Sequence, residues 1–152
     1  MSNLIFEDKP CYDAGMKMIL SVAPVILLAQ AVQVYLTEGL AEAKAVAMPL
    51  VIIFLIYLFV LPRRYQVMDD GIKILLGRPF SIGYSYGAIS EVTRQGRHYF
   101  GINLATAISS NRSVYVLRDR GMRVAITPCD PDAFVRAASQ AMESWKRTGI
   151  AK

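Results

Sequence analysis

The sequence predicts an α+β chain: a two-helix transmembrane hairpin, followed by a bent antiparallel sheet or partial barrel that a C-terminal helix caps. Three observations lead to this prediction. No charged residue lies within 18–37 or within 45–62. Beyond Arg63, short runs of alternating apolar and polar residues are separated by turn residues, which is typical of antiparallel strands. The C-terminal residues instead repeat their apolar positions at helical spacing.

The two uncharged stretches have the length of membrane spans. They comprise 20 and 18 residues, and a helix of about 17 to 25 apolar residues crosses the roughly 30 Å hydrocarbon core of a bilayer. Only seven residues, 38–44, join them, so we expect two antiparallel neighbouring helices. The chain therefore divides into 1–62, the N-terminal segment and the hairpin, and 63–152, a separate domain.

Positive charge near the ends of the spans predicts their orientation. Lys9 and Lys17 precede the first span and Arg63 and Arg64 follow the second, whereas the connecting loop carries one Lys and two Glu. We therefore expect a multi-pass membrane protein with both termini and the C-terminal domain in the cytoplasm. Lys17, Arg63 and Arg64 would anchor the hairpin at the membrane interface.

A cleaved signal peptide is the alternative interpretation of the first span. The triplet Ala41-Glu42-Ala43 resembles a small-residue cleavage site. The n-region of a signal peptide is short and positive, whereas residues 1–17 hold two Lys against three acidic residues. The membrane hairpin is the better prediction.

Two glutamines interrupt the first span. Gln30 and Gln33 are three residues apart, so they share one face of a helix. An amide that faces lipid lacks hydrogen-bond partners, so we expect this face to contact protein. Either the second helix, where Tyr57 is the best candidate, or another membrane subunit would supply the contact, and the sequence favours the external subunit.

Domain 63–152 has the alternation and turns of a small β domain. Asp69-Asp70-Gly71 contains an Asp-Gly pair, a strong hairpin signal. The predicted strands are 64–68, 72–76, 80–84, 88–93, about 99–104, 113–117 and 122–127.

The last element is an amphipathic helix. Asp130 is a good N-cap and Pro131 suits the first helical position. The apolar stripe comprises Phe134, Ala138, Ala141, Met142 and Trp145. We expect this stripe to cover the inner face of the sheet.

Four segments resemble bacterial pleckstrin-homology-like domains, a family often preceded by membrane hairpins. The segments are 65–74 (YQVMDDGIKI), 82–89 (IGYSYGAI), 107–112 (AISSNR) and 125–134 (AITPCDPDAF). The resemblance covers 64 to about 142 and implies the bent sheet with its capping helix. Gly83 replaces the usual proline and Tyr86 a common acidic residue. Eukaryotic members that bind phosphoinositides have Lys and Arg in the first hairpin loop, where Asp69-Asp70 would here repel phosphate.

The basic residues of the domain form a candidate surface. From Arg63 onward the chain has 14 Lys or Arg against 7 Asp or Glu, a net charge of +7. Such a domain is attracted to anionic lipid or to acidic proteins, and a plainly solvated basic face is the simplest alternative. No nucleic-acid recognition motif accompanies the charge, so nucleic acid is not an expected partner. The candidate residues are Lys73, Arg78, Arg94 and Arg97 on one side and Arg118, Arg120 and Arg123 around another turn.

Catalysis is not expected. Gly83-Tyr84-Ser85-Tyr86-Gly87 fits the pattern of a nucleophile elbow, but that motif needs a following helix, and residues 88–93 are predicted to be a strand. The single histidine, His98, and the widely separated Cys11 and Cys129 match no metal spacing. We expect no enzyme activity, cofactor, metal or small-molecule substrate, and no structural disulfide in a reducing cytoplasm.

These features together predict an interaction protein. The domain would be a docking module and the hairpin its anchor, in an accessory subunit or assembly factor of a larger bacterial inner-membrane complex. Its partners would be membrane lipids and other membrane protein subunits. The alternative function is that of a sensor whose basic loops bind anionic lipid headgroups.

Overall fold

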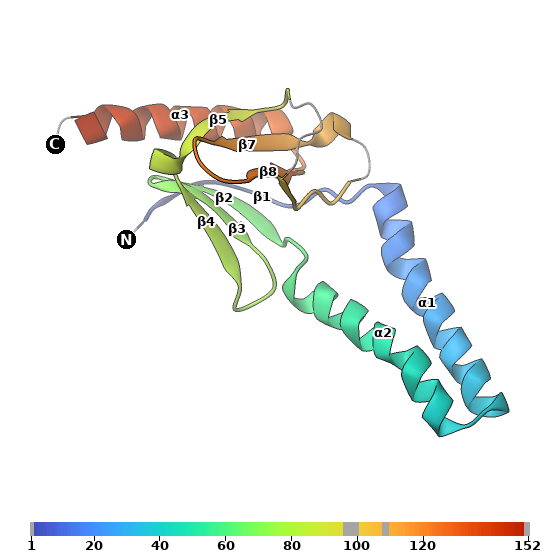
Figure 1. Cartoon of the computed structure of the whole chain (residues 1–152). Coiled ribbons are helices and arrows are strands. Elements are labelled where there is room, and N and C mark those ends of the chain that lie inside the picture. Colours follow the sequence, from blue (N-terminus) through green and yellow to red (C-terminus); the bar gives the residue numbers. More distant parts are fainter. Residues whose placement is uncertain (1, 96–100, 108–109, 151–152) are drawn as a thin grey trace.

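Two long helices project from a domain of two sheets and a third helix in the computed structural model of the chain (Figure 1). The structure describes residues 2–95, 101–107 and 110–150. The layout is α+β, as predicted.

The hairpin consists of α1 (Ala14–Thr37) and α2 (Leu40–Phe59). Asp13 caps α1 by accepting a hydrogen bond from the amide of Met16 at 2.7 Å. Both helices are long and apolar enough to cross a membrane, and 6% of the most apolar 18-residue window of each is buried within the structure. The first expected span lies inside α1, as predicted.

The second helix begins earlier and ends earlier than the expected span of 45–62. Gly39 adopts φ +100°, a conformation that costs glycine little, so the chain reverses over Glu38 and Gly39 alone. The alanine-rich residues that follow favour helix and extend α2 back to Leu40. The connection is therefore two residues long rather than seven.

The first sheet is antiparallel in the order β1-β2-β3-β4. Three of its strands follow the predicted positions closely: β2 (Arg64–Met68), β3 (Gly71–Leu75) and β4 (Ser81–Ser85). The sequence did not predict β1 (Leu4–Asp8), which pairs with β2 as an edge strand. The domain of 63–152 thus takes in a segment that precedes the hairpin, and the hairpin is an insertion between two neighbouring strands.

The second sheet has the order β5-β7-β8-β6. It comprises β5 (Ile89–Thr93), β6 (Gly101–Asn103), β7 (Val114–Arg118) and β8 (Arg123–Ile126). β6 pairs with β8 in parallel, so the expectation of a purely antiparallel sheet is wrong. The reason is that the chain reverses twice: β7 runs opposite to β6, and β8 reverses again and lies between them, so it runs in the direction of β6. The link from β6 to β7 includes the short helix η2 (Ser110–Arg112).

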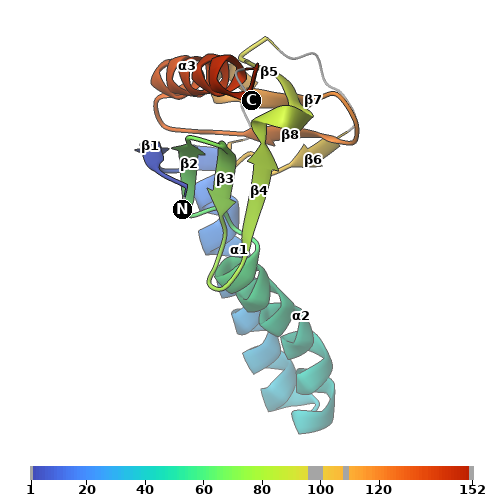
Figure 2. The ribbon, with the colours of Figure 1, turned by 90° about the vertical axis from the view of Figure 1, so that its left-hand side faces the viewer.

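The core lies between the two sheets and beneath α3 (Pro131–Ile150) (Figure 2). A short helical turn, η1 (Tyr86–Ala88), connects the sheets. The predicted N-cap is confirmed: Asp130 Oδ1 accepts a hydrogen bond from the amide of Ala133 at 2.9 Å. The buried core residues include Tyr65, Val67, Ile72 and Ile74 from the first sheet, Val114, Val116, Val124 and Ile126 from the second, and Phe134, Ala138, Ala141 and Met142 from α3.

Candidate anion-binding site at the hairpin base

A cavity of about 710 Å³ opens where the two long helices meet the sheet domain. We call it the hairpin-base cavity. It lies between the first turns of α1 and the chain that leaves α2. Its lining residues are Lys9, Pro10, Tyr12, Lys17, Leu20, Ser21, Tyr57, Leu61, Pro62, Arg63 and Arg64.

Two tyrosines hold the walls of the hairpin-base cavity together. The hydroxyl of Tyr12 donates a hydrogen bond to the carbonyl of Pro62 at 3.1 Å. The hydroxyl of Tyr57, on α2, donates to the carbonyl of Leu20 on α1. Burial raises the pKa of Tyr12, so this residue remains a protonated donor at neutral pH. These bonds fix the spacing between the base of α1 and the end of α2.

Four cationic side chains line the hairpin-base cavity: Lys9, Lys17, Arg63 and Arg64. Arg64 Nη1 is 2.5 Å from Glu7 Oε1 on β1. Within the described residues, the other three cations form no ion pair with a carboxylate.

Both carboxylate oxygens of Glu7 accept a hydrogen bond. Its second oxygen accepts a hydrogen bond from Gln66 Nε2 at 2.6 Å. This bond, together with the Arg64 guanidinium, lowers the pKa of Glu7. The Glu7 carboxylate therefore holds Arg64 and also attracts Lys9, whereas Lys17 and Arg63 form no ion pair with a carboxylate among the described residues.

The lining of the hairpin-base cavity also includes apolar side chains. Leu20 on α1 and Leu61 after α2 share the lining with the four cations. Cations and apolar side chains in one cavity match an amphipathic ligand with an anionic head. Arg and Lys bind phosphate through charge-assisted hydrogen bonds.

A second cavity, of about 880 Å³, lies between the end of α2 and the first sheet. We call it the β3–β4 cavity. Arg63 and Arg64 line both cavities, and Lys73 and Arg78 join them in the second. The structure thus brings two residues of the predicted basic surface together with two predicted interface anchors.

The turn between β3 and β4 packs on the end of α2. The rings of Phe59 and Phe80 meet edge to face with centroids 5.7 Å apart. A Cβ atom on Gly77 would lie 1.3 Å from the carbonyl oxygen of Leu58, so only glycine fits at this contact. This packing sets the sheet domain against the hairpin base.

Lys73 and Arg78 line the β3–β4 cavity, and Arg94 is not among its lining residues. Arg94 lies against the start of α3, where its guanidinium bonds Asp132 Oδ1 at 2.7 Å and the carbonyl of Asn111 at 2.9 Å. Arg97 lies outside the described residues. Arg94 follows β5 of the second sheet, whereas Lys73 lies on β3 of the first.

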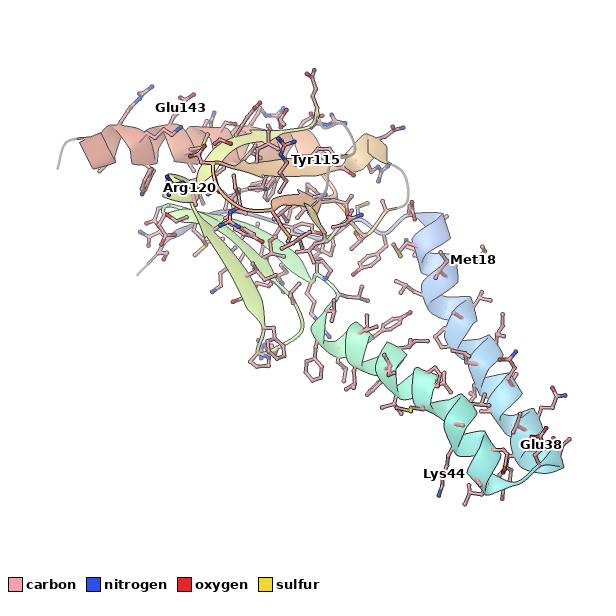
Figure 3. All side chains as sticks on the ribbon, in the orientation of Figure 1. Met18, Glu38, Lys44, Tyr115, Arg120 and Glu143 are labelled. Carbon is pink, nitrogen blue, oxygen red and sulfur yellow. The ribbon has the colours of Figure 1, made fainter. Side chains whose placement is uncertain are left out.

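Arg118, Arg120 and Arg123 lie around the turn between β7 and β8, as predicted. Arg118 stacks on the ring of Tyr84, with its guanidinium carbon 5.2 Å from the ring centroid. Arg123 is half-buried, and Arg120 is exposed. Figure 3 shows Arg120 on the sheet domain, well away from Met18 at the base of α1.

Gln30 and Gln33 are both exposed on α1. Within the described residues, neither side chain forms a hydrogen bond, and Tyr57 bonds backbone near the other end of α1 instead. The far tip of the hairpin carries Glu38 and Lys44 (Figure 3). The contact between the two helices buries small residues, Ala31 and Ala43.

Ser85 stands at the N-cap of η1, where its hydroxyl accepts a hydrogen bond from the amide of Gly87 at 3.4 Å. As predicted, a strand follows rather than a long helix, here after one helical turn. His98 lies outside the described residues. Within the described chain, no three His, Cys, Asp or Glu side chains gather as a metal site.

In the sequence, Lys9 serves only to predict the orientation of the spans, and no pattern points to Tyr12. The signal that could have found them is their position beside the base of the first span. Comparison with known proteins adds no relative: no family model, no curated protein and no solved structure matches the chain.

Proposed function

We propose that the protein is a membrane-anchored interaction module whose hairpin-base cavity binds the phosphate of an anionic lipid. The observation that carries the proposal is that Lys9, Lys17 and Arg63 line one cavity together with Leu20 and Leu61, and that none of the three forms an ion pair with a carboxylate among the described residues. The lipid would hold the sheet domain against the bilayer surface.

The position of the cations supports a lipid rather than a soluble anion. Lys17 lies in the first turn of α1 and Arg63 follows the end of α2, so both reach headgroup depth if the helices cross the bilayer. Each basic residue near an anionic surface contributes about 1 kcal/mol of attraction. Acyl chains would continue along Leu20 and Leu61.

The orientation is part of the proposal. Because the hairpin is inserted between β1 and β2, both of its ends emerge from the same domain (Figure 1). The basic end faces the cytoplasm under the positive-inside rule, and Lys44 shares the other end with Glu38 and Glu42. We assign the protein to the bacterial inner membrane, in keeping with the proposed pleckstrin-homology-like family.

The loop between β2 and β3, where pleckstrin-homology domains bind phosphoinositides, is not the proposed lipid site in this chain. The acidic turn Asp69-Asp70 accepts hydrogen bonds from the N-terminal segment: the hydroxyl of Ser2 donates to Asp70, and the side-chain amide of Asn3 donates to Asp69. This turn lies at the end of the first sheet remote from the hairpin (Figure 1). The lipid is therefore proposed at the hairpin base and not at the loop that phosphoinositide-binding relatives use.

The test is the thermal stability of the full-length protein in detergent micelles with added phosphatidylglycerol or phosphatidylcholine. A ligand at about 100 times its Kd stabilises the folded state by about 2.7 kcal/mol, which raises Tm by several degrees. We expect this rise with phosphatidylglycerol alone. It should disappear in a Lys17→Gln, Arg63→Gln variant and persist in Lys44→Gln, which removes a cation from the far end. Equal shifts with both lipids would refute the proposal.

A second function, docking to another membrane protein, is favoured by the exposure of Gln30 and Gln33. An unpaired amide in hydrocarbon is unfavourable, and a helix of another subunit would satisfy both. The protein would then be an accessory subunit or assembly factor of a larger complex.

Extraction in mild detergent tests the docking function. We expect the wild-type protein to migrate in a defined large complex, and Gln30→Leu with Gln33→Leu to release it. Val32→Leu, which alters an exposed neighbour of both glutamines, should leave the complex intact. Migration of the wild type as a free monomer or homo-oligomer would exclude this function.

A further inference from the structure

The N-terminal segment lies beside the loop that joins β8 to α3. Pro10 and Pro128 form an isolated antiparallel bridge. The amide of Cys11 donates to the carbonyl of Thr127 at 2.8 Å, and the amide of Cys129 donates to the carbonyl of Lys9 at 3.1 Å. Because side chains alternate along extended chains, Cys11, Thr127 and Cys129 project on one side.

The two cysteines lie diagonally across this bridge. Partial desolvation raises the pKa of Cys129 to about 11, and the neighbouring Cys11 thiol contributes to the rise. Arg112 Nη1 donates a hydrogen bond to Cys11 Sγ at 3.0 Å. Cys129 is exposed and Cys11 is half-buried. These are the chain's two cysteines, although 118 positions separate them in the sequence.

We propose that Cys11 and Cys129 are a peroxide-oxidised thiol pair that forms a reversible disulfide between the starts of α1 and α3. The Cys11 thiolate attacks one oxygen of hydrogen peroxide, and the O–O bond breaks to give a sulfenic acid and hydroxide. The proton lost by Cys11 converts that hydroxide to water. The Cys129 sulfur then attacks the Cys11 sulfur, the S–O bond breaks, and the leaving hydroxide takes the proton of Cys129 to become a second water. Two thiols and one peroxide thus give one disulfide and two waters.

The surroundings of the pair assign the two roles. Arg112 donates a hydrogen bond to Cys11 Sγ, so the structure assigns Cys11 as the sulfur that meets the peroxide. Cys129 keeps its proton at neutral pH and is placed to resolve the sulfenic acid. Reversible disulfides in reducing compartments are typically redox-sensing.

The bond would join the hairpin base to the end of the sheet domain. Cys11 lies two residues before Asp13, which caps α1, and Cys129 immediately precedes Asp130, which caps α3. Lys9 and Tyr12, on either side of Cys11, line the hairpin-base cavity. Oxidation would therefore fix one wall of that cavity, whether or not a lipid occupies it.

The experiment uses the full-length protein in detergent micelles, treated with hydrogen peroxide, alkylated and analysed by intact mass and peptide mapping. We expect a monomer in which both thiols resist alkylation, a Cys11–Cys129 cross-linked peptide, a higher Tm and full reversal by dithiothreitol. Cys129→Ser should stop at a sulfenic acid on Cys11 that dimedone traps. Cys11→Ser should leave Cys129 open to alkylation.

Arg112→Ala tests the role of the guanidinium. It should slow oxidation by about 5-fold or more, whereas Arg120→Ala, which removes an exposed cation elsewhere on the domain, should leave the rate unchanged. Equal rates in the two variants would overturn the assigned role of Arg112. Retention of both free thiols after peroxide, intermolecular dimers alone, or sulfinic acid on either cysteine would overturn the proposal itself.

Discussion

Large apolar side chains are buried in the sheet domain but exposed on the hairpin. In the sheet domain, Val67 and Ile126 are fully buried. In the hairpin, Leu36 is 76% exposed and Val25 is 65% exposed, and the contact between the helices buries alanines. The domain excludes water from a core of its own, whereas the hairpin has no such core. Large apolar side chains that face outward along two long helices are typical of helices surrounded by hydrocarbon.

The two regions meet at the hairpin base, which is why the candidate site lies there. Tyr12 bonds Pro62, and Gly77 packs on Leu58, so both the N-terminal segment and the first sheet are joined to the ends of the helices. Four cations gather at this junction. Substitutions within each region and at the junction should therefore have unequal effects.

The largest expected difference in stability is between alanine substitutions at two phenylalanines. Phe134 is fully buried, with its ring centroid 6.3 Å from those of Phe6 and Tyr65. Phe134→Ala should destabilise the sheet domain by about 3–5 kcal/mol. Phe54, on α2, is 61% exposed, and Phe54→Ala should leave the unfolding of the domain within about 0.5 kcal/mol of the wild type. Chemical denaturation in micelles measures both, and similar losses would contradict the contrast between the two regions.

Alanine substitutions at two glycines test whether the sheet domain packs on the hairpin base. A Cβ on Gly77 would collide with the end of α2, whereas a Cβ on Gly83 would meet nothing within 4 Å. We expect Gly77→Ala to cost about 1–3 kcal/mol and Gly83→Ala to change stability by less than about 0.5 kcal/mol. A thermal shift assay compares them. If the two variants were equally stable, the turn between β3 and β4 would not pack on α2.

Alkaline pH should act on the sheet domain through Tyr65. Burial raises the pKa of Tyr65 from 10.0 to about 12. The unfolded chain loses this proton first as the pH rises, so stability is fully present below about pH 10 and falls between about pH 10 and 12 by about 2 kcal/mol. Tyr65→Phe should show a smaller fall over this interval. Each protein is compared with itself at about pH 8, because the substitution also removes hydrogen bonds. A fall of the same size in both would exclude Tyr65 as its origin.

The smallest effect concerns Glu7 at the edge strand. Hydrogen bonds from Gln66 and Arg64 lower the pKa of Glu7 from 4.5. Its contribution is therefore present above about pH 4.5 and is lost as the pH falls through the lowered value. Glu7→Gln should cost less than about 1 kcal/mol at neutral pH and nothing at about pH 2. Glu91→Gln, an exposed substitution on β5, should have no effect at either pH. A Glu7→Gln cost that did not depend on pH would contradict an ionic contribution.

Local patterns predicted the elements whose partners are close in sequence. Asp69-Asp70-Gly71 marked the hairpin of β2 and β3, and Asp130 with Pro131 marked the start of α3. These signals depend on backbone preferences of a few residues, so they are visible without tertiary structure.

The sequence did not predict contacts between segments that lie far apart along the chain. β1 pairs with β2 across the whole hairpin, and Leu4–Asp8 has no turn beside it to indicate a partner. The parallel pairing of β6 with β8 likewise depends on where β8 inserts. Lys73 and Arg78 join Arg63 and Arg64 because β3 and β4 lie beside α2, which no local pattern records. The neighbouring cysteines were missed for the same reason.

The most direct test of the central claim compares two exposed positions with tryptophan as a depth probe. Phe54 on α2 is 61% exposed and Met122 in the sheet domain is 53% exposed. In a Trp145→Phe background, Phe54→Trp and Met122→Trp each place one indole at these positions, and the proteins are reconstituted into vesicles with lipids brominated on the acyl chains. The account predicts strong quenching of fluorescence for Phe54→Trp and none for Met122→Trp. Equal quenching of the two, or none in either, would contradict a hairpin surrounded by hydrocarbon.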